Sequence, residues 1–286
     1  FEEGSLSNKN EAIEQARKIA DKVGERLGKT SNPKSMELLQ RAIELEPNDA
    51  GFHHNICLEG HYHSEFSAHD IFEHHKRFGL IFNQPHNNYV EEQCSAQANG
   101  KLRIGFVSSD LRVHSISYFL MPLLETLDYQ KFETFFYFNG EDEDPVTKLI
   151  RDTAFGWRKI LHLDDQLVVD QINSDQINIL FDLNGHTGGS RLTLFAKKPA
   201  PVQTTWLGYP NTTGLEAVDY RLSDDISDPP GLSDQLHTEE VIRLKTGPWC
   251  YSGHEEARPS GAMPLDENGY LTFGSFNNTQ KLFFLF

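Results

Sequence analysis

The chain has 286 residues, of which 38% are hydrophobic and 24% charged, as is typical of a soluble globular protein with one large or two modest domains. Its formal net charge of −16 disfavours a nucleic-acid partner or an anionic membrane surface. The sequence has no apolar run long enough for a membrane span, and its three widely spaced cysteines favour a reducing compartment. We therefore expect a cytoplasmic protein, or a nucleocytoplasmic one in a eukaryote.

The first third of the chain has the pattern of helices. Apolar residues recur at helical spacing over 9–29, and a second helix is expected to start at Pro33 and to end before the turn at Pro47. The run AIELEPNDAGFHHNI (42–56) resembles the end of one tetratricopeptide repeat and the opening of the next. About one repeat is visible, whereas a stable solenoid needs about three. With a further helix over 66–82, we expect a helical arm over 1–85 that ends in a transition helix.

A polar linker is expected over 86–100, and the periodicity then changes to that of strands alternating with helices. This alternation predicts a mostly parallel, doubly wound sheet over 101–270, with a ligand site beyond the carboxyl ends of its strands. The candidate strands are 102–107, 132–138, 177–183, 202–207, 218–223, 240–244 and 270–276.

Two loops that follow candidate strands carry polar side chains suited to chemistry. The loop SSDLRVHS (108–115) holds Asp110 and His114 four residues apart, where a histidine can accept a proton near neutral pH and a carboxylate can orient it. The run NGHTGG (184–189) has the small residues that let backbone N–H groups face an anion or a sugar hydroxyl. Without further information the alternatives are a helix-capping loop and an ordinary turn.

The most informative segment is PAPVQTTWLGYPNTTG (199–214). In it an apolar strand leads into a loop that contains Gly208, Pro210 and Gly214, residue types typical of turns. Such a loop lets the backbone come close to a ligand. A tight turn between strands is the alternative, and Trp206 and Tyr209 are interpreted as core aromatics rather than as sugar platforms.

Together these segments resemble the protein O-linked N-acetylglucosamine transferase and SPINDLY family, glycosyltransferase family 41. The resemblance covers about residues 34–282 and rests on LRIGFVSSD (102–110), FDLNGHTGG (181–189), PAPVQTTWLGYPNTTG (199–214) and FGSFNN (273–278). It implies the Rossmann-like N-terminal lobe of a two-lobed GT-B glycosyltransferase, preceded by a TPR-like α-helical segment. It also implies an inverting, metal-independent transfer of N-acetylglucosamine from UDP-GlcNAc to Ser or Thr of proteins, which the arm would recruit.

The resemblance assigns roles to individual residues. It implies that Asp110 and His114 line the donor sugar and that a histidine at the junction of arm and lobe reaches the cleft as a general base. We carry that role to His53, with His54 as the register alternative. The remaining predicted sugar or donor contacts are Ile56, Cys57, Gly185, His186, Leu207, Gly208 and Pro210. The family has Pro-Thr after the histidine that matches His114, and this chain has Ser115-Ile116 instead.

In the family, most nucleotide contacts come from a second lobe. FGSFNNTQKL (273–282) resembles the start of that lobe, with 271–286 assigned to it, but FFLF (283–286) does not resemble its continuation. We therefore expect a truncated chain that is inactive alone. Two alternatives stay open: a SPINDLY-like O-fucosyltransferase that uses GDP-fucose, because GYPNTTG and FGSFNN look closer to that branch, and a non-catalytic protein-binding fragment.

The sequence does not predict a metal site. Eight of the thirteen histidines lie between 53 and 86, but none forms the pair four residues apart beside a carboxylate that zinc enzymes place on one helix face. The acidic run Asp224, Asp225 and Asp228 is interpreted as a solvated turn rather than a metal-binding motif.

Overall fold

The computed structural model describes residue 14 and residues 33–84, 100–253, 261 and 263–274. The predicted linker 86–100 lies outside the described residues except for its last residue, and so does the predicted helix 9–29 except for residue 14, which is helical. Within the described part of the chain, no helix is both long and apolar enough to cross a membrane.

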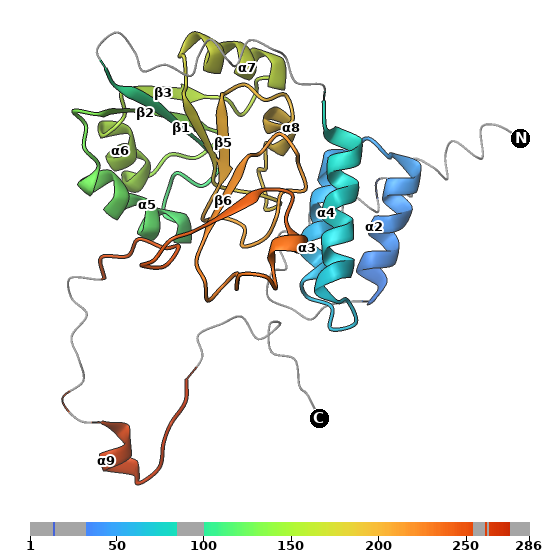
Figure 1. The fold of residues 1–286 in the computed structure, drawn as a ribbon, viewed down its shortest axis with the longest axis vertical. Coiled ribbons are helices and arrows are strands. Elements are labelled where there is room, and N and C mark those ends of the chain that lie inside the picture. Colours follow the sequence, from blue (N-terminus) through green and yellow to red (C-terminus); the bar gives the residue numbers. More distant parts are fainter. Residues whose placement is uncertain (1–13, 15–32, 85–99, 254–260, 262, 275–286) are drawn as a thin grey trace, which may run out of the picture.

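The helical arm consists of α2 (Pro33–Leu45), α3 (Ala50–Gly60) and α4 (Ala68–Phe82), which lie side by side in Figure 1. Asp49 caps α3 by accepting the amide N–H groups of Gly51 and Phe52, and Ser67 and Asp70 form a capping box at the start of α4. A small apolar cluster holds the arm together; it comprises Met36, Leu39, Ala42, Ile43, Phe52, Ile56 and Cys57.

Residues 102–243 contain one seven-stranded sheet, in which every strand pairs in parallel with its neighbours in the order β3-β2-β1-β4-β5-β6-β7. The strands are β1 (Leu102–Ser108), β2 (Phe132–Phe138), β3 (Gly156–Lys159), β4 (Ile179–Asp182), β5 (Val202–Thr205), β6 (Tyr220–Ser223) and β7 (Glu240–Arg243). The connecting helices are α5 (Ser115–Thr126), α6 (Pro145–Asp152), α7 (Asp165–Ser174), α8 (Leu192–Phe195) and the 3-10 turn η2 (Asp234–Leu236).

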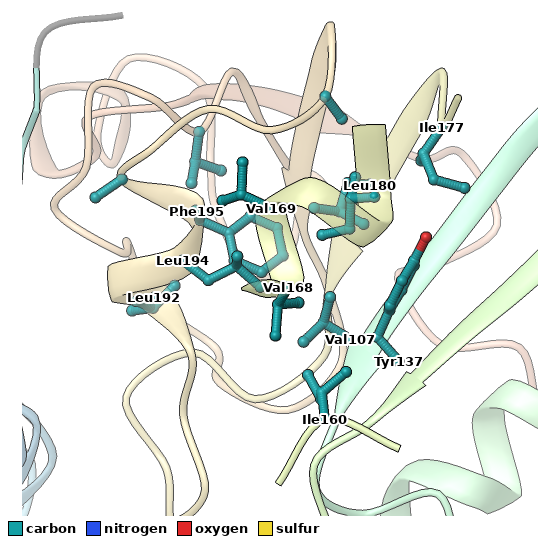
Figure 2. Packing of buried hydrophobic residues seen from close by; sticks show 14 of the residues in the cluster. Val107, Tyr137, Ile160, Val168, Val169, Ile177, Leu180, Leu192, Leu194 and Phe195 are labelled. Carbon is teal, nitrogen blue, oxygen red and sulfur yellow. The ribbon is translucent and has the colours of Figure 1, made fainter. Parts of the chain in front are cut away.

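The sheet is covered on both faces because its strand residues alternate between two apolar clusters. One cluster packs α5 and α6 on Phe106, Phe136 and Phe138. The other packs α7 and α8 on Val107, Tyr137 and Leu180, as Figure 2 shows. The α/β, Rossmann-like fold predicted for this region is confirmed, and the order of strands places the carboxyl ends of β1, β4 and β5 next to one another at one edge of the sheet.

The arm is packed directly against this lobe. Phe78 of α4 is fully buried and belongs to the same apolar cluster as Val107 and Leu180. Gly79 lies so close to the loop after β5 that a Cβ atom there would stand 1.8 Å from the carbonyl oxygen of Gly214. The arm and the lobe therefore share part of one core.

The observed strands differ from the predicted ones in two places. β3 was not predicted, because four residues with two basic side chains carry little strand pattern. Residues 270–274 were predicted as part of a strand, yet they are exposed and no described strand pairs with them, while 275–286 lie outside the described residues. The short helix α9 (Pro264–Asn268) precedes this segment.

Candidate active site at the strand tips

The loop after β1 leads into α5 and places Asp110 and His114 at the carboxyl edge of the sheet. His114 is the N-cap of α5, and its Nδ1 accepts the amide N–H of Ile116 at 3.4 Å. Because this weak bond uses the lone pair of Nδ1, the neutral ring carries its proton on Nε2. Asp110 is buried and accepts hydrogen bonds from Asn184 at 3.0 Å and Arg112 at 3.4 Å, so these residues, and not His114, orient its carboxylate.

The loop after β4 is tied to the loop after β1 by Asn184. Its side-chain oxygen accepts the amide N–H of Ser109 at 3.0 Å, and its amide group donates to the Ser109 hydroxyl at 2.8 Å as well as to Asp110. The Asp182 carboxylate accepts N–H groups of Asn184 and Gly185 and the Thr205 hydroxyl. Burial raises the pKa of Asp182 even though these donors oppose the shift.

The loop after β5 is pressed against the loop after β4 without room for side chains between them. A Cβ atom on Gly208 would lie 2.0 Å from the carbonyl oxygen of Leu183, and one on Gly185 would lie 2.3 Å from the Cβ of Tyr209. Leu207 adopts φ of +68°, a left-handed conformation that is costly for a branched side chain. These contacts join the loops that carry Gly185 and Gly208, while Asn184 ties the loop after β4 to the loop after β1 that leads to His114.

A cavity of about 170 Å³ opens beside this edge, and Leu207 and Pro210 line it. Its other walls include Trp206, Trp249 and the buried Arg221. The indole N–H of Trp206 donates to the carbonyl oxygen of Pro248 at 2.6 Å, which fixes that aromatic wall.

The interpretation of Asp228 as part of a solvated turn was wrong. Asp228 is a buried residue in the wall of this cavity, and its carboxylate accepts hydrogen bonds from Arg221, Ser223 and, at 3.0 Å, His237. Burial raises the pKa of Asp228, but the three hydrogen-bond donors outweigh burial and hold the pKa well below its ordinary value. Asp228 therefore supplies a permanent negative charge paired with Arg221.

Three of the predicted site residues belong to helix α3 of the arm. His53 is buried, packs edge-on against Phe82 and donates its Nε2 proton to the carbonyl oxygen of Pro47 at 2.9 Å. Ile56 and Cys57 belong to the apolar cluster of the arm. Their predicted catalytic or donor-binding roles stay predictions.

His186 comes from the loop after β4, but its ring is buried against the arm. Its Nε2 donates to the carbonyl oxygen of Thr213 at 2.8 Å, and its Nδ1 lies 2.8 Å from Nδ1 of His54. His75 of α4 bonds the hydroxyl of Tyr209 at 2.8 Å. Burial lowers the pKa of His54 to about 3 and holds the pKa values of His75 and His186 well below their ordinary value. The joint cluster, as we call it, consists of His54, His61, His75, His186 and Tyr209, whose hydroxyl His61 also contacts.

The sequence did not single out Asn184 as a bridge or His75 and Tyr209 as members of a joint. The motif NGHTGG contained Asn184, and the signal that could have marked it is an amide directly after a buried strand, where backbone N–H and C=O groups lack partners. The histidine excess over 53–86 is plain in the sequence, but no spacing rule connects it to His186 or Tyr209, which are more than a hundred residues away.

We compared the chain with known protein families and with proteins of known sequence or structure. The family model "Glycosyl transferase family 41" matches residues 65–246, which is more than half of the chain. The chain belongs to glycosyltransferase family 41. The match spans α4 and the whole parallel sheet, including the loops after β1, β4 and β5.

Several relatives are plant proteins. The chain is 36% identical over 244 residues to the "Probable UDP-N-acetylglucosamine--peptide N-acetylglucosaminyltransferase SPINDLY" of Petunia hybrida, covering 84% of this chain and 26% of the relative. The Arabidopsis thaliana protein of the same name is 36% identical over 243 residues, with the same coverage. The chain thus spans about a quarter of the length of these relatives.

A solved structure supports the fold assignment. A K341M mutant of the Thermobaculum terrenum O-GlcNAc transferase superposes with a TM-score of 0.70 at 33% sequence identity, covering 76% of this chain and 41% of that chain. The similarity therefore extends over most of the described residues of this family-41 chain.

Proposed function

We propose that this chain forms the donor-sugar side of the active site of a protein O-glycosyltransferase that takes N-acetylglucosamine from UDP-GlcNAc. The observation that carries the proposal is the junction of three loops at the tips of β1, β4 and β5. Asn184 joins the first two loops, and Gly208 packs on Leu183 to join the third. Family membership and the names of the relatives support the reaction class and the donor.

His114 is the residue that this geometry favours for contact with the donor. It stands at the N-terminus of α5, where backbone N–H groups and the helix dipole favour a negative charge, and it is partly exposed. With Nδ1 engaged by the cap, its Nε2–H is available to donate a hydrogen bond to a sugar or diphosphate oxygen. We therefore assign His114 the role of a hydrogen-bond donor to the leaving group or sugar, with Asp110 of the same loop held in place by Asn184.

Transfer requires that the leaving nucleotide diphosphate be stabilised by positive charge. Arg221 pairs with Asp228, and Arg191 pairs with Asp165 at 2.8 Å, so both of these cations already have an acidic partner. We accordingly propose that the main diphosphate contacts come from protein outside the described residues, and that this chain alone does not transfer sugar.

The proposal can be tested in a chimera. Residues 65–246 of this chain would replace the matching segment of the full-length Arabidopsis relative, and transfer to an acceptor peptide would be measured with UDP-GlcNAc and with GDP-fucose. We expect transfer from UDP-GlcNAc, and we expect His114→Ala to lower kcat by about 100-fold or more, because it removes a donor aimed at developing charge.

The matched control is His69→Ala, since the side chain of His69 is 72% exposed on the arm, and the chimera should keep its rate. Unchanged transfer by the His114→Ala chimera would refute the role of His114. Transfer from GDP-fucose alone would replace the proposed donor by the SPINDLY-like alternative, and a chimera that binds acceptor without transferring either sugar would favour a binding role.

A further inference from the structure

The joint between the arm and the lobe contains three buried side chains that can ligate a metal ion. Cys57 comes from α3, His75 from α4 and His186 from the loop after β4, and all three are at most 1% exposed. One ligand atom from each lies within 4.8 Å of the ligand atoms of the other two. Two consecutive arm helices and one loop of the lobe therefore deliver a thiol and two imidazoles to one place.

The hydrogen bonds of the two histidines fix which nitrogen of each ring keeps a lone pair for a metal ion. His75 donates its Nδ1 proton to the carbonyl oxygen of Ile71 at 2.7 Å, and His186 donates its Nε2 proton to the carbonyl oxygen of Thr213 at 2.8 Å. Each neutral ring is thus left with a lone pair on its other nitrogen, Nε2 of His75 and Nδ1 of His186. A histidine held by a backbone carbonyl through its outer nitrogen is the usual arrangement of a metal ligand.

We propose that Cys57, His75 and His186 bind a zinc ion that fastens the helical arm to the sheet lobe. One thiolate and two imidazoles with a fourth position for water is a ligand set that Zn²⁺ accepts. Tetrahedral bonds of about 2.0 to 2.3 Å put ligand atoms about 3.3 to 3.7 Å apart, so the three atoms need to close by roughly 1.5 Å at most.

Binding exchanges existing contacts for metal bonds. The ion takes the lone pair that His75 Nε2 now offers to the Tyr209 hydroxyl and the one that His186 Nδ1 offers to His54. The Cys57 S–H bond breaks, its electron pair goes to zinc and its proton leaves to solvent. Burial raises the pKa of the Cys57 thiol, so zinc must displace that proton and its affinity must rise with pH. The zinc proposal does not rest on the proposed function, although the family resemblance also predicts Cys57 and His186 as donor contacts.

The experiment uses the purified chain after removal of metal by EDTA. A variant with Cys94→Ser and Cys250→Ser leaves Cys57 as the only thiol, since the chain has three cysteines. Co²⁺ would be titrated as a spectroscopic probe, followed by Zn²⁺ in competition with a chromophoric chelator. We expect one equivalent of Co²⁺ to produce a thiolate-to-metal charge-transfer band with intense tetrahedral ligand-field bands, and we expect Zn²⁺ to bleach both.

The decisive comparison adds Cys57→Ala to that variant. We expect the charge-transfer band to disappear and the affinity for Zn²⁺ to fall on the order of 100-fold or more, while far-ultraviolet circular dichroism checks that the chain is folded. The band in the single-thiol variant already identifies Cys57 if the added substitution prevents folding. Absence of the band in the single-thiol variant, or its survival after Cys57→Ala, would overturn the proposal and leave the joint cluster as a purely hydrogen-bonded core.

Discussion

Asn184 shows how a single polar side chain can define a site. Its side-chain amide forms hydrogen bonds with the backbone N–H and hydroxyl of Ser109 and with the carboxylate of Asp110. One residue after β4 therefore fixes the loop after β1. A buried amide with this many partners is costly to replace, because each orphaned donor or acceptor loses its hydrogen bond without regaining water. The loop geometry around His114 thus depends on a residue outside its own loop.

Gly208 allows a test of the packing between the loops after β4 and β5, because a single added methyl group would disturb it. Gly208→Ala would place a methyl group against the backbone of Leu183, which has little freedom to move, and we expect it to lower the free energy of unfolding by about 1–3 kcal/mol or more. Urea denaturation of the purified variant measures this change. Gly188→Ala is the matched control, because no atom lies within 4 Å of a Cβ there. Equal stability of the two variants would contradict the close approach of the two loops.

Helix α3 shows which contacts stabilise the arm. Asp49 caps it, Phe52 and Ile56 fill the arm core, and His53 is buried with its ring donating to Pro47. Burial lowers the pKa of His53 more than the bond to Pro47 raises it. The folded arm therefore holds this imidazole in its neutral form.

A pH dependence follows from that pKa. The unfolded chain binds a proton near pH 6.5 whereas the folded chain does so at lower pH, so stability from His53 is present above pH 6.5 and falls as the pH drops below it. The limiting slope for one histidine is about 1.4 kcal/mol per pH unit. We expect His53→Gln to reduce the loss of stability between pH 7.5 and 5, measured by urea denaturation in EDTA. His69→Gln, on an exposed side chain, should leave the loss unchanged; a parallel profile for His53→Gln would refute the assignment.

The elements were predictable from the sequence to the extent that their pattern is local. The apolar strands β1 and β2 and the capped helices α4 and α6 carry their own signals, whereas β3 is defined by pairing with β2 and by Phe135 lying against Gly156. The site was predictable as a set of loops, because parallel strands end at one edge. The directions of the side chains could not be predicted. His186 follows β4 in the motif, but its ring contacts His54, because packing against the arm decides its rotamer.

At the scale of the whole molecule, Phe78 makes the arm and the lobe one folding unit. Its ring lies in the cluster that also contains Val107 and Leu180, and it packs against His54 and His186 in the joint cluster. Separation of the arm would expose this ring together with part of the lobe core. The arm is therefore expected to unfold with the sheet and not before it.

Phe78→Ala tests this coupling. We expect a loss of about 3–5 kcal/mol of stability from the cavity and the lost burial. Because Trp157, Trp206 and Trp249 are the three tryptophans and all lie in the lobe, their fluorescence reports the lobe while circular dichroism reports helices. Both signals should shift together in urea. Leu80→Ala is the matched control, because Leu80 lies two residues from Phe78 and is 82% exposed, and it should shift neither signal. A shift in circular dichroism alone would mean that the arm folds independently.

The strand order also has a consequence for biosynthesis. β2 and β3 add successively to one side of β1, and β4 through β7 add successively to the other side, so no strand has to insert between two that are already paired. A nascent polypeptide emerging from the ribosome can therefore assemble the sheet outward, strand by strand, in the order of translation. Until residue 182 has emerged, the free flank of β1 is the growing edge, and a pause in translation there would leave that edge open to mispairing.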